Sequence, residues 1–193
     1  MKMKKLRYGY GDLFGSILFV AILFMISPFT EAAEIRCPTD NPDGLTCNGI
    51  IATCVGTAEN DVIHGTKDAD VIVALGGDDT VIGHKGDDVI CGDDGNDVLI
   101  GNSGDDYLDG GPGNDVLKGN KDDDTLIGGE GDDRLTGNNG DDYLDGGPGN
   151  DVLHGNGGMD ELIGGDDTDV CRGGIKNDVI DVSCESGETE EPV

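Results

Sequence analysis

The sequence has few of the residues that build an ordinary globular core. It contains no Trp, and aromatic residues make up only 4% of its 193 residues. Gly, in contrast, occurs 35 times. A chain with so many glycines and so few large side chains cannot fill a broad hydrophobic core. The composition therefore excludes a conventional globular domain and favours a repetitive fold held together by other interactions.

Basic residues are also scarce. The chain has 12 Lys and Arg residues against 41 Asp and Glu residues, a formal net charge of -29. This charge repels nucleic acid and anionic membrane surfaces, and it opposes compaction of the chain itself. We therefore expect no nucleic-acid partner, and we expect cations to neutralise the folded chain.

Motifs typical of enzymes are missing. The chain has no H-E-x-x-H, no G-x-S-x-G and no glycine-rich loop ending in G-K-[ST]. Its histidines, His64, His84 and His154, are isolated in the sequence and form no zinc-binding pattern with the cysteines. We expect no catalytic residues and no enzymatic activity.

The N-terminal 33 residues are typical of a signal peptide. Lys2 to Arg7 form a basic segment, residues 13–26 form an apolar run, and Thr30-Glu31-Ala32 offers a cleavage site. The apolar run is shorter than the ~18 residues expected of a membrane-spanning helix. Cleavage is therefore favoured over retention as an anchor, and both stay open. After cleavage we expect no membrane span and a secreted protein, free or associated with the cell surface.

Six cysteines accompany this segment. An even number of cysteines in an exported chain favours disulfides, because the compartment outside is oxidising. We expect the three cysteines of residues 34–55 to crosslink the N-terminal end and the last two to pair with each other, whereas the fourth has no evident partner. In chain order the six are Cys37, Cys47, Cys54, Cys91, Cys171 and Cys184.

One repeat dominates the rest of the chain. Gly stands five residues before the repeated aspartate in thirteen units, with Ala74 as the exception, and two residues before it in nine units. Two residues after the aspartate stands an apolar residue or, in one unit, Cys171. The unit is G-x-x-G-x-D-x-U-x, where U is apolar. The aspartate recurs every nine residues at fourteen positions: Asp61, Asp70, Asp79, Asp88, Asp97, Asp106, Asp115, Asp124, Asp133, Asp142, Asp151, Asp160, Asp169 and Asp178.

This unit predicts turns and short strands. A nine-residue period does not fit a helix, and two glycines per unit would destabilise a helix interior. Gly, Asn and Asp favour turns with positive φ, so the last three residues of the unit form the strand. Residue U points inward, and its neighbours, such as Val71, Val73 and Val89, point outward. The second position alternates between Asn and Gly over residues 102–165, which predicts two units per coil and about seven coils.

Stacked coils indicate calcium. Coils at the strand spacing of about 4.8 Å would bring carboxylates together, and these repel one another unless a cation neutralises them. Calcium accepts six to eight oxygen ligands in flexible geometry, and Gly-rich turns expose carbonyl oxygens beside the carboxylates. We expect several Ca²⁺ ions, at most about a dozen, since sites formed between coils are limited by the fourteen units.

The repeat resembles the RTX, or hemolysin-type, calcium-binding nonapeptide over residues 56–181. The resemblance implies an all-β fold, a right-handed parallel β-roll (β-solenoid), in which the aspartate of all fourteen units is a side-chain calcium ligand. Units that depart from the pattern lie mainly near the ends, so we expect the tightest sites between Gly83 and Asp160. Weaker ligand candidates directly precede the repeated aspartates: Asp78, Asp87, Asp105, Asp123, Asp132 and Asp141.

The chain is thus expected to comprise a signal peptide (1–33), a Cys-bearing N-terminal cap (34–55), the β-roll (56–181) and an acidic C-terminal tail (182–193). The expected function is a secreted module that folds on binding calcium and serves as a structural or adhesive element of the cell surface or matrix. One alternative is a calcium-dependent partner or stabiliser of a separate secreted enzyme. Another is binding of ice or polysaccharide through the outward rows.

Overall fold

The computed structural model describes residues 33–37, 41, 44–174 and 177–184. Its regular structure is entirely β, and none of these residues lies in a helix. Of the predicted signal peptide only Ala33 is described, and of the predicted tail only residues 182–184. Within the described ranges, no helix is long and apolar enough to cross a membrane.

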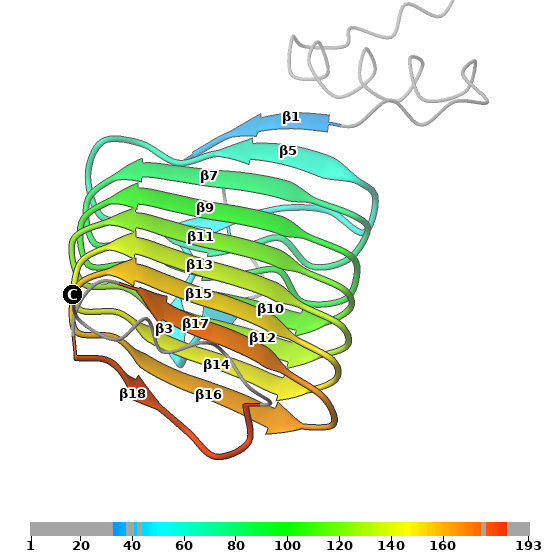
Figure 1. Ribbon diagram of the computed structural model, residues 1–193. Helices are drawn as coiled ribbons and strands as arrows, with labels where there is room; N and C mark the ends of the chain where they lie inside the picture. Colours follow the sequence, from blue (N-terminus) through cyan, green and yellow to red (C-terminus); the bar gives the residue numbers. More distant parts are fainter. Residues whose placement is uncertain (1–32, 38–40, 42–43, 175–176, 185–193) are drawn as a thin grey trace, which may run out of the picture. The chain divides into compact units, whose positions relative to one another are not determined.

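The strands form two parallel eight-stranded sheets and one short hairpin (Figure 1). Sheet one contains, in spatial order, β1 (Ala33–Arg36), β5 (Asp61–His64), β7 (Thr80–Lys85), β9 (Val98–Ser103), β11 (Val116–Lys121), β13 (Arg134–Asn139), β15 (Val152–Gly157) and β17 (Val170–Gly174). Sheet two contains β4 (Cys54–Val55), β6 (Val71–Val73), β8 (Val89–Cys91), β10 (Tyr107–Pro112), β12 (Thr125–Glu130), β14 (Tyr143–Pro148), β16 (Glu161–Asp166) and β18 (Val179–Ile180). The antiparallel hairpin joins β2 (Thr46–Cys47) and β3 (Ile50–Ile51).

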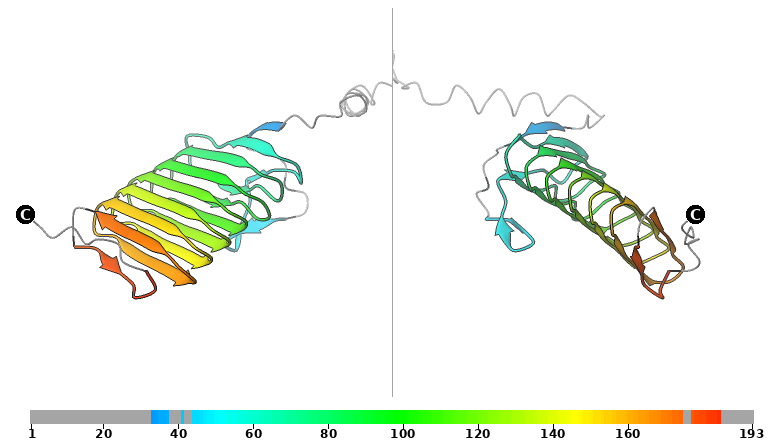
Figure 2. Two further views of the ribbon diagram at one scale, coloured as in Figure 1. Left: turned by 45° about the vertical axis from the view of Figure 1, so that its right-hand side comes forward. Right: turned by 60° about the vertical axis from the view of Figure 1, so that its left-hand side comes forward.

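Strands of one sheet pair with an offset of 18 residues. Leu117 stands beside Leu135 in sheet one, and Leu108 stands beside Leu126 in sheet two. Because consecutive strands alternate between the sheets, the chain winds into a β-solenoid of about seven turns (Figure 2). The first turn is longer than the others, as the pairing of Ile35 with Ile63 shows. Its additional residues include the β2–β3 hairpin.

The core is one column of side chains between the two sheets. Residue U of every unit from Ile63 to Cys171 is fully buried, and these side chains form a single cluster. Buried and less buried residues alternate along the strands, as the two-residue period of a strand requires. The predicted all-β parallel β-solenoid is therefore confirmed.

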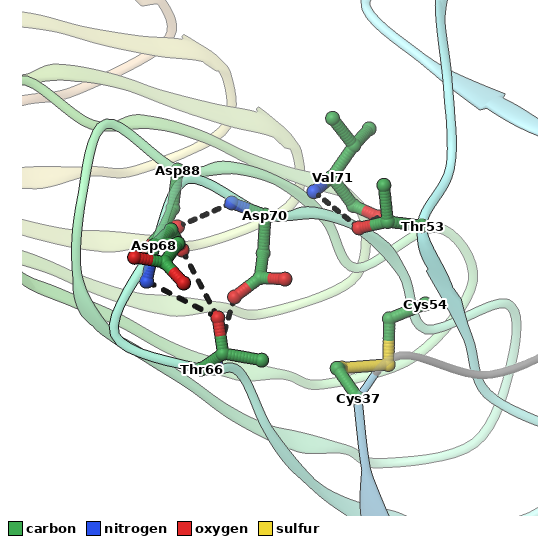
Figure 3. The surroundings of a disulfide bond; sticks show 8 residues. All are labelled: Cys37, Thr53, Cys54, Thr66, Asp68, Asp70, Val71 and Asp88. Atoms are coloured by element: carbon green, nitrogen blue, oxygen red, sulfur yellow. Dashed lines mark hydrogen bonds between the residues drawn. A yellow bond between two sulfur atoms is a disulfide. The ribbon is translucent and has the colours of Figure 1, made fainter.

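Disulfides close both ends of this column. Cys54 occupies an inward position at the N-terminal end and bonds to Cys37 (Figure 3). Cys171 occupies an inward position at the C-terminal end and bonds to Cys184. The predicted pairing of these last two cysteines is confirmed.

The third disulfide holds the hairpin against the outer face of sheet two. It joins Cys47 of β2 to Cys91 of β8, 44 residues apart. The bond belongs to a second apolar cluster that includes Ala52 and Val73. Val73 lies on the outer face, as expected, but the chain itself covers this part of the face, so only 2% of Val73 is exposed. The N-terminal cysteines do fasten this end, but Cys47 does so through the roll.

The backbone explains why Asn and Gly alternate at the second position of the unit. Residues there have positive φ, between 79° and 91° at Asn102, Asn120, Asn138 and Asn156. Gly adopts this conformation freely and Asn tolerates it better than most residues do. The Asn row therefore has a structural cause that requires no ligand.

Replacing His84 with asparagine should stabilise the fold. His84 occupies this second position with a φ of 86°, and its exposed ring stacks on His64. Because Asn suits the conformation better, we expect the free energy of unfolding in calcium to rise by about 1 kcal/mol, measured by chemical denaturation. The reciprocal change, Asn102→His, should lower it by a similar amount. If the unaltered chain and both variants were equally stable, the preference for Asn at this backbone conformation would be refuted.

Candidate metal centre

The fourteen repeated aspartates form two continuous stacks, one at each turn edge of the roll. Thirteen of them are at most 5% exposed, and Asp178 is partly buried. The stack that leads into sheet one contains Asp61, Asp79, Asp97, Asp115, Asp133, Asp151 and Asp169. The stack that leads into sheet two contains Asp70, Asp88, Asp106, Asp124, Asp142, Asp160 and Asp178.

In every repeated aspartate except Asp61 and Asp70, which begin the two stacks, one carboxylate oxygen accepts a hydrogen bond from the backbone of the preceding member of the stack. The backbone N–H of Asp106, for example, donates to Oδ1 of Asp124 at 2.9 Å. The same bond, over 18 residues, recurs between successive members of both stacks at 2.7–3.0 Å. These bonds fix the orientation of the carboxylates and leave the second oxygen, Oδ2, available for another partner.

That second oxygen is buried and lacks a hydrogen bond in most units. A buried polar atom without a partner is costly, and a buried charge costs more. In the described part of the chain, the ion pairs join only Arg36 to Glu34 and Lys67 to Asp68, so no Lys or Arg neutralises the stacks. The aspartates with an unpartnered Oδ2 are Asp79, Asp88, Asp97, Asp106, Asp115, Asp124, Asp133, Asp142, Asp151 and Asp169.

The first glycine of the unit makes room for this oxygen. A Cβ atom at Gly92 would lie 2.2 Å from Oδ2 of Asp97 and 2.6 Å from the carbonyl oxygen of Gly110. At Gly128, it would lie 2.4 Å from the Oδ2 atom of its own unit and 2.5 Å from the carbonyl oxygen of Gly146. The unpartnered carboxylate oxygen and a carbonyl of the next turn thus converge on one small space. Both are oxygen donors of the kind that calcium prefers.

Side chains alone do not make a metal site. In the described ranges, no three His, Cys, Asp or Glu side chains gather so that they could hold a metal ion. A cation bound at the stacks would therefore take many of its ligands from turn carbonyls. This donor set fits calcium, which accepts carbonyl oxygens, and it does not fit zinc, which prefers nitrogen and sulfur.

The first two units differ from the rest. The backbone N–H and the hydroxyl of Thr57 donate to Oδ2 of Asp61 at 2.7 and 2.9 Å. The backbone N–H of Thr66 donates to Oδ2 of Asp70 at 2.6 Å (Figure 3). These bonds occupy the oxygens that a cation would need. We therefore expect Asp61 and Asp70 to be the weakest ligands, and Thr at the second position is the sequence signal.

The weaker ligand candidates lie outside the stacks, exposed to solvent. Their Oδ1 atoms accept backbone N–H groups along the turn edges, as when Asp123 binds the N–H of Asp141 at 2.8 Å. Asn96 and Asn114 accept the same kind of bond at equivalent positions. Because Asn serves equally well, this position requires a hydrogen-bond acceptor and no negative charge. The set comprises Asp78, Asp87, Asp105, Asp123, Asp132 and Asp141.

Burial disfavours ionisation of the stacked aspartates. The pKa of Asp124 is raised to about 8, mainly by burial and also by the charges of Asp106 and Asp142, while the backbone hydrogen bond acts in the opposite direction. The same cause raises the pKa of eight further stacked aspartates, to about 7 for Asp79, Asp88, Asp106 and Asp133 and to about 6 for Asp97, Asp115, Asp142 and Asp151.

These shifts predict opposite effects of pH with and without calcium. Without calcium, groups with a raised pKa stabilise the fold at low pH, and this stability is lost as pH rises through about 6 to 8. With calcium, acidification should weaken binding over the same range, since protons compete for the carboxylates. Circular dichroism at pH 8 and pH 5, with chelator or calcium, would measure both effects. A calcium-free chain that loses β structure between pH 8 and pH 5 would refute the first.

The fold and the stacks define a class of protein: a parallel β-solenoid whose turns present rows of buried, partly satisfied carboxylates to cations. The chain belongs to the RTX calcium-binding nonapeptide repeat family, whose model matches it in four copies, over residues 55–90, 86–117, 118–153 and 145–180. The predicted resemblance is therefore confirmed, and the chain is a calcium-binding repeat protein. Among curated proteins, none matches it.

Proposed function

We propose that the chain is an exported protein whose roll folds on binding calcium and then acts as a structural or adhesive element outside the cell. The observation that carries this proposal is the buried, unpartnered Oδ2 atom, repeated in ten aspartates of the two stacks. A row of such atoms is unfavourable at neutral pH without cations, so binding and folding are coupled.

In this proposal the repeated aspartates are the side-chain ligands and calcium lies between successive turns. Turn carbonyls such as that of Gly110 would supply further oxygens, and bound calcium would neutralise the stacks. At most about a dozen ions fit fourteen units, with the weakest sites at Asp61 and Asp70. The roll is right-handed with two nonapeptide units in each coil, which the 18-residue pairing offset supports.

Export rests on the signal peptide proposed for residues 1–33 and on the cysteines. All three disulfides fit an oxidising compartment. The cap of residues 34–55 supplies two strands to the sheets and the hairpin that covers sheet two. No catalytic role is proposed for any residue.

A calcium titration tests the proposal. Far-UV circular dichroism of the purified chain at neutral pH should show a cooperative gain of β signal with calcium, reversed by a chelator. Magnesium at the same concentration should produce little change, since it demands a stricter octahedral geometry and keeps its waters. A chain that is equally folded in chelator, or that stays unfolded in calcium, would overturn the coupling of folding to calcium.

A further inference from the structure

The outer face of sheet one carries no acidic residue from β5 to β17. This absence is unexpected in a chain with 41 Asp and Glu residues. The residues that flank the inward positions on these seven strands are apolar, neutral or basic. They are Val62, His64, Thr80, Ile82, Val98, Ile100, Val116, Lys118, Arg134, Thr136, Val152, His154, Val170 and Arg172.

The basic residues of this face gather on four successive strands, and we call Lys118, Arg134, His154 and Arg172 the basic face. Pairing register sets His154 beside Arg172, and Thr136 beside both Lys118 and His154. Burial and the charges of Arg172 and Arg134 lower the pKa of His154, so Lys118, Arg134 and Arg172 supply the positive charge of this face at neutral pH. Lys118, Arg134 and Arg172 are exposed and form no ion pair with any described residue.

The outer face of sheet two has the opposite charge. From β10 to β16 its outward residues include Asp109, Asp145 and Glu161, which we call the acidic face, and no basic residue. The other outward residues there are Tyr107, Thr125, Ile127, Tyr143 and Ile163. The β2–β3 hairpin packs against the preceding strands, β6 and β8, through the Cys47–Cys91 bond and Val73. The acidic face therefore begins where this cover ends.

We propose that the basic face of one copy docks on the acidic face of a second copy of this chain. Both faces belong to the same roll, so their strands share one spacing of about 4.8 Å, and opposite charges on several strands of the two faces can stay in register. The charges are complementary, and the residues between them are mostly β-branched or aromatic, which suits close packing of two sheets. Because the two surfaces differ, the contact is heterologous, and each copy in a pair still has one free face. Further copies can bind there, so we expect a linear assembly.

A long polyanion fits the basic face less well than a second copy does. Exposed carboxylates line the turn edges at both ends of these strands, Asp105 and Asp123 on one edge and Asp132 on the other. A polymer longer than the patch would meet these charges. The acids on the sheet-two face of a second roll, Asp109, Asp145 and Glu161, lie on the strands themselves, where they can meet the basic residues.

This inference rests on the proposed function in one respect. The net charge of -29 opposes contact between copies, and bound calcium reduces it. We therefore expect association in calcium at low ionic strength, with weakening as salt screens the charges.

Charge reversal tests the docking by sedimentation velocity in calcium. The triple variants Lys118→Glu/Arg134→Glu/Arg172→Glu and Asp109→Lys/Asp145→Lys/Glu161→Lys should each associate at least tenfold more weakly than the unaltered chain. An equimolar mixture of the two should associate again, because each supplies the face that the other now complements. A matched control, Lys67→Glu/Lys85→Glu/Lys121→Glu, reverses three lysines outside the basic face and should retain association; Lys85 and Lys121 end β7 and β11 at the turn edge and Lys67 lies in a turn, and we call the three the turn lysines.

Four outcomes would overturn the inference: a monomeric unaltered chain, undiminished association of either face variant, no recovery in the mixture, or equal loss in the turn-lysine control. Circular dichroism in calcium must first show that each protein is folded. Failure of the unaltered chain to fold in calcium counts against the calcium proposal, whereas an unaltered chain that is folded and monomeric counts against docking alone. If a reversal variant does not fold, the milder Lys118→Gln/Arg134→Gln/Arg172→Gln replaces it and should also weaken association.

Discussion

Replacing Gly131 with alanine should strongly destabilise the centre of the roll. Gly131 has a φ of 127°, and a Cβ atom there would lie 1.9 Å from the carbonyl oxygen of Gly113 in the preceding turn. Neither atom can move without shifting backbone. We expect a loss of about 3 kcal/mol or more, combining backbone strain and overpacking, measured by denaturation in saturating calcium.

Gly76→Ala is the matched control. The nearest atom to its Cβ would be the carbonyl oxygen of Asp94 at 3.6 Å, an ordinary contact. Two other units have Asp122 and Asp167 at the position equivalent to Gly131, but their φ values, 72° and 79°, lie in the left-handed region that Asp tolerates. A Gly131→Ala protein as stable as the Gly76→Ala control would show that the turns yield more easily than the packing implies.

Replacing Asp124 with asparagine should weaken calcium binding without destabilising the calcium-free chain. Asparagine keeps an Oδ1 atom that can accept the N–H of Asp106, so the backbone bond survives. It loses the second carboxylate oxygen, which is buried and unpartnered. We expect a loss of about 10- to 100-fold in the calcium affinity of the affected site, measured by titration against a chromophoric chelator.

Asp123→Asn makes the same change of charge one residue away, at an exposed position that other units fill with Asn. Calcium affinity should change little in this variant. Equal effects of the two substitutions would mean that net charge alone controls affinity. Unchanged binding by Asp124→Asn would remove the stacked aspartates from the proposed ligand set.

The regular part of the fold could be predicted because one short period determines it. Each unit carries its own turn residues and one inward side chain, such as Leu99 or Leu117, so local preferences and the stacked fold agree. The burial of the aspartates also follows from their constant distance to the inward residue. Their bonding does not, because the N–H that Asp124 accepts comes from the preceding turn and depends on the pairing register.

The parts of the fold that could not be predicted depend on contacts that occur at a single place in the molecule and do not follow the repeat. The Cys47–Cys91 bond joins a segment outside the repeat to one strand within it, and no period relates the two. The covering of Val73 follows from the same contact. The sequence shows Thr57 and Thr66 at the second position of the first two units. Only the structure reveals that these residues donate to Oδ2 of Asp61 and Asp70.

The disulfides at the two ends of the core column bear on how such a chain can evolve. Cys37–Cys54 and Cys171–Cys184 each terminate the column through one inward residue and depend little on what lies between them. The segment GDDYLDGGPGNDVL occurs at residues 104–117 and again at 140–153, a displacement of two whole turns. Duplication in multiples of 18 residues thus lengthens the molecule while both termini of the column stay intact. Length is the property that selection can adjust most easily here.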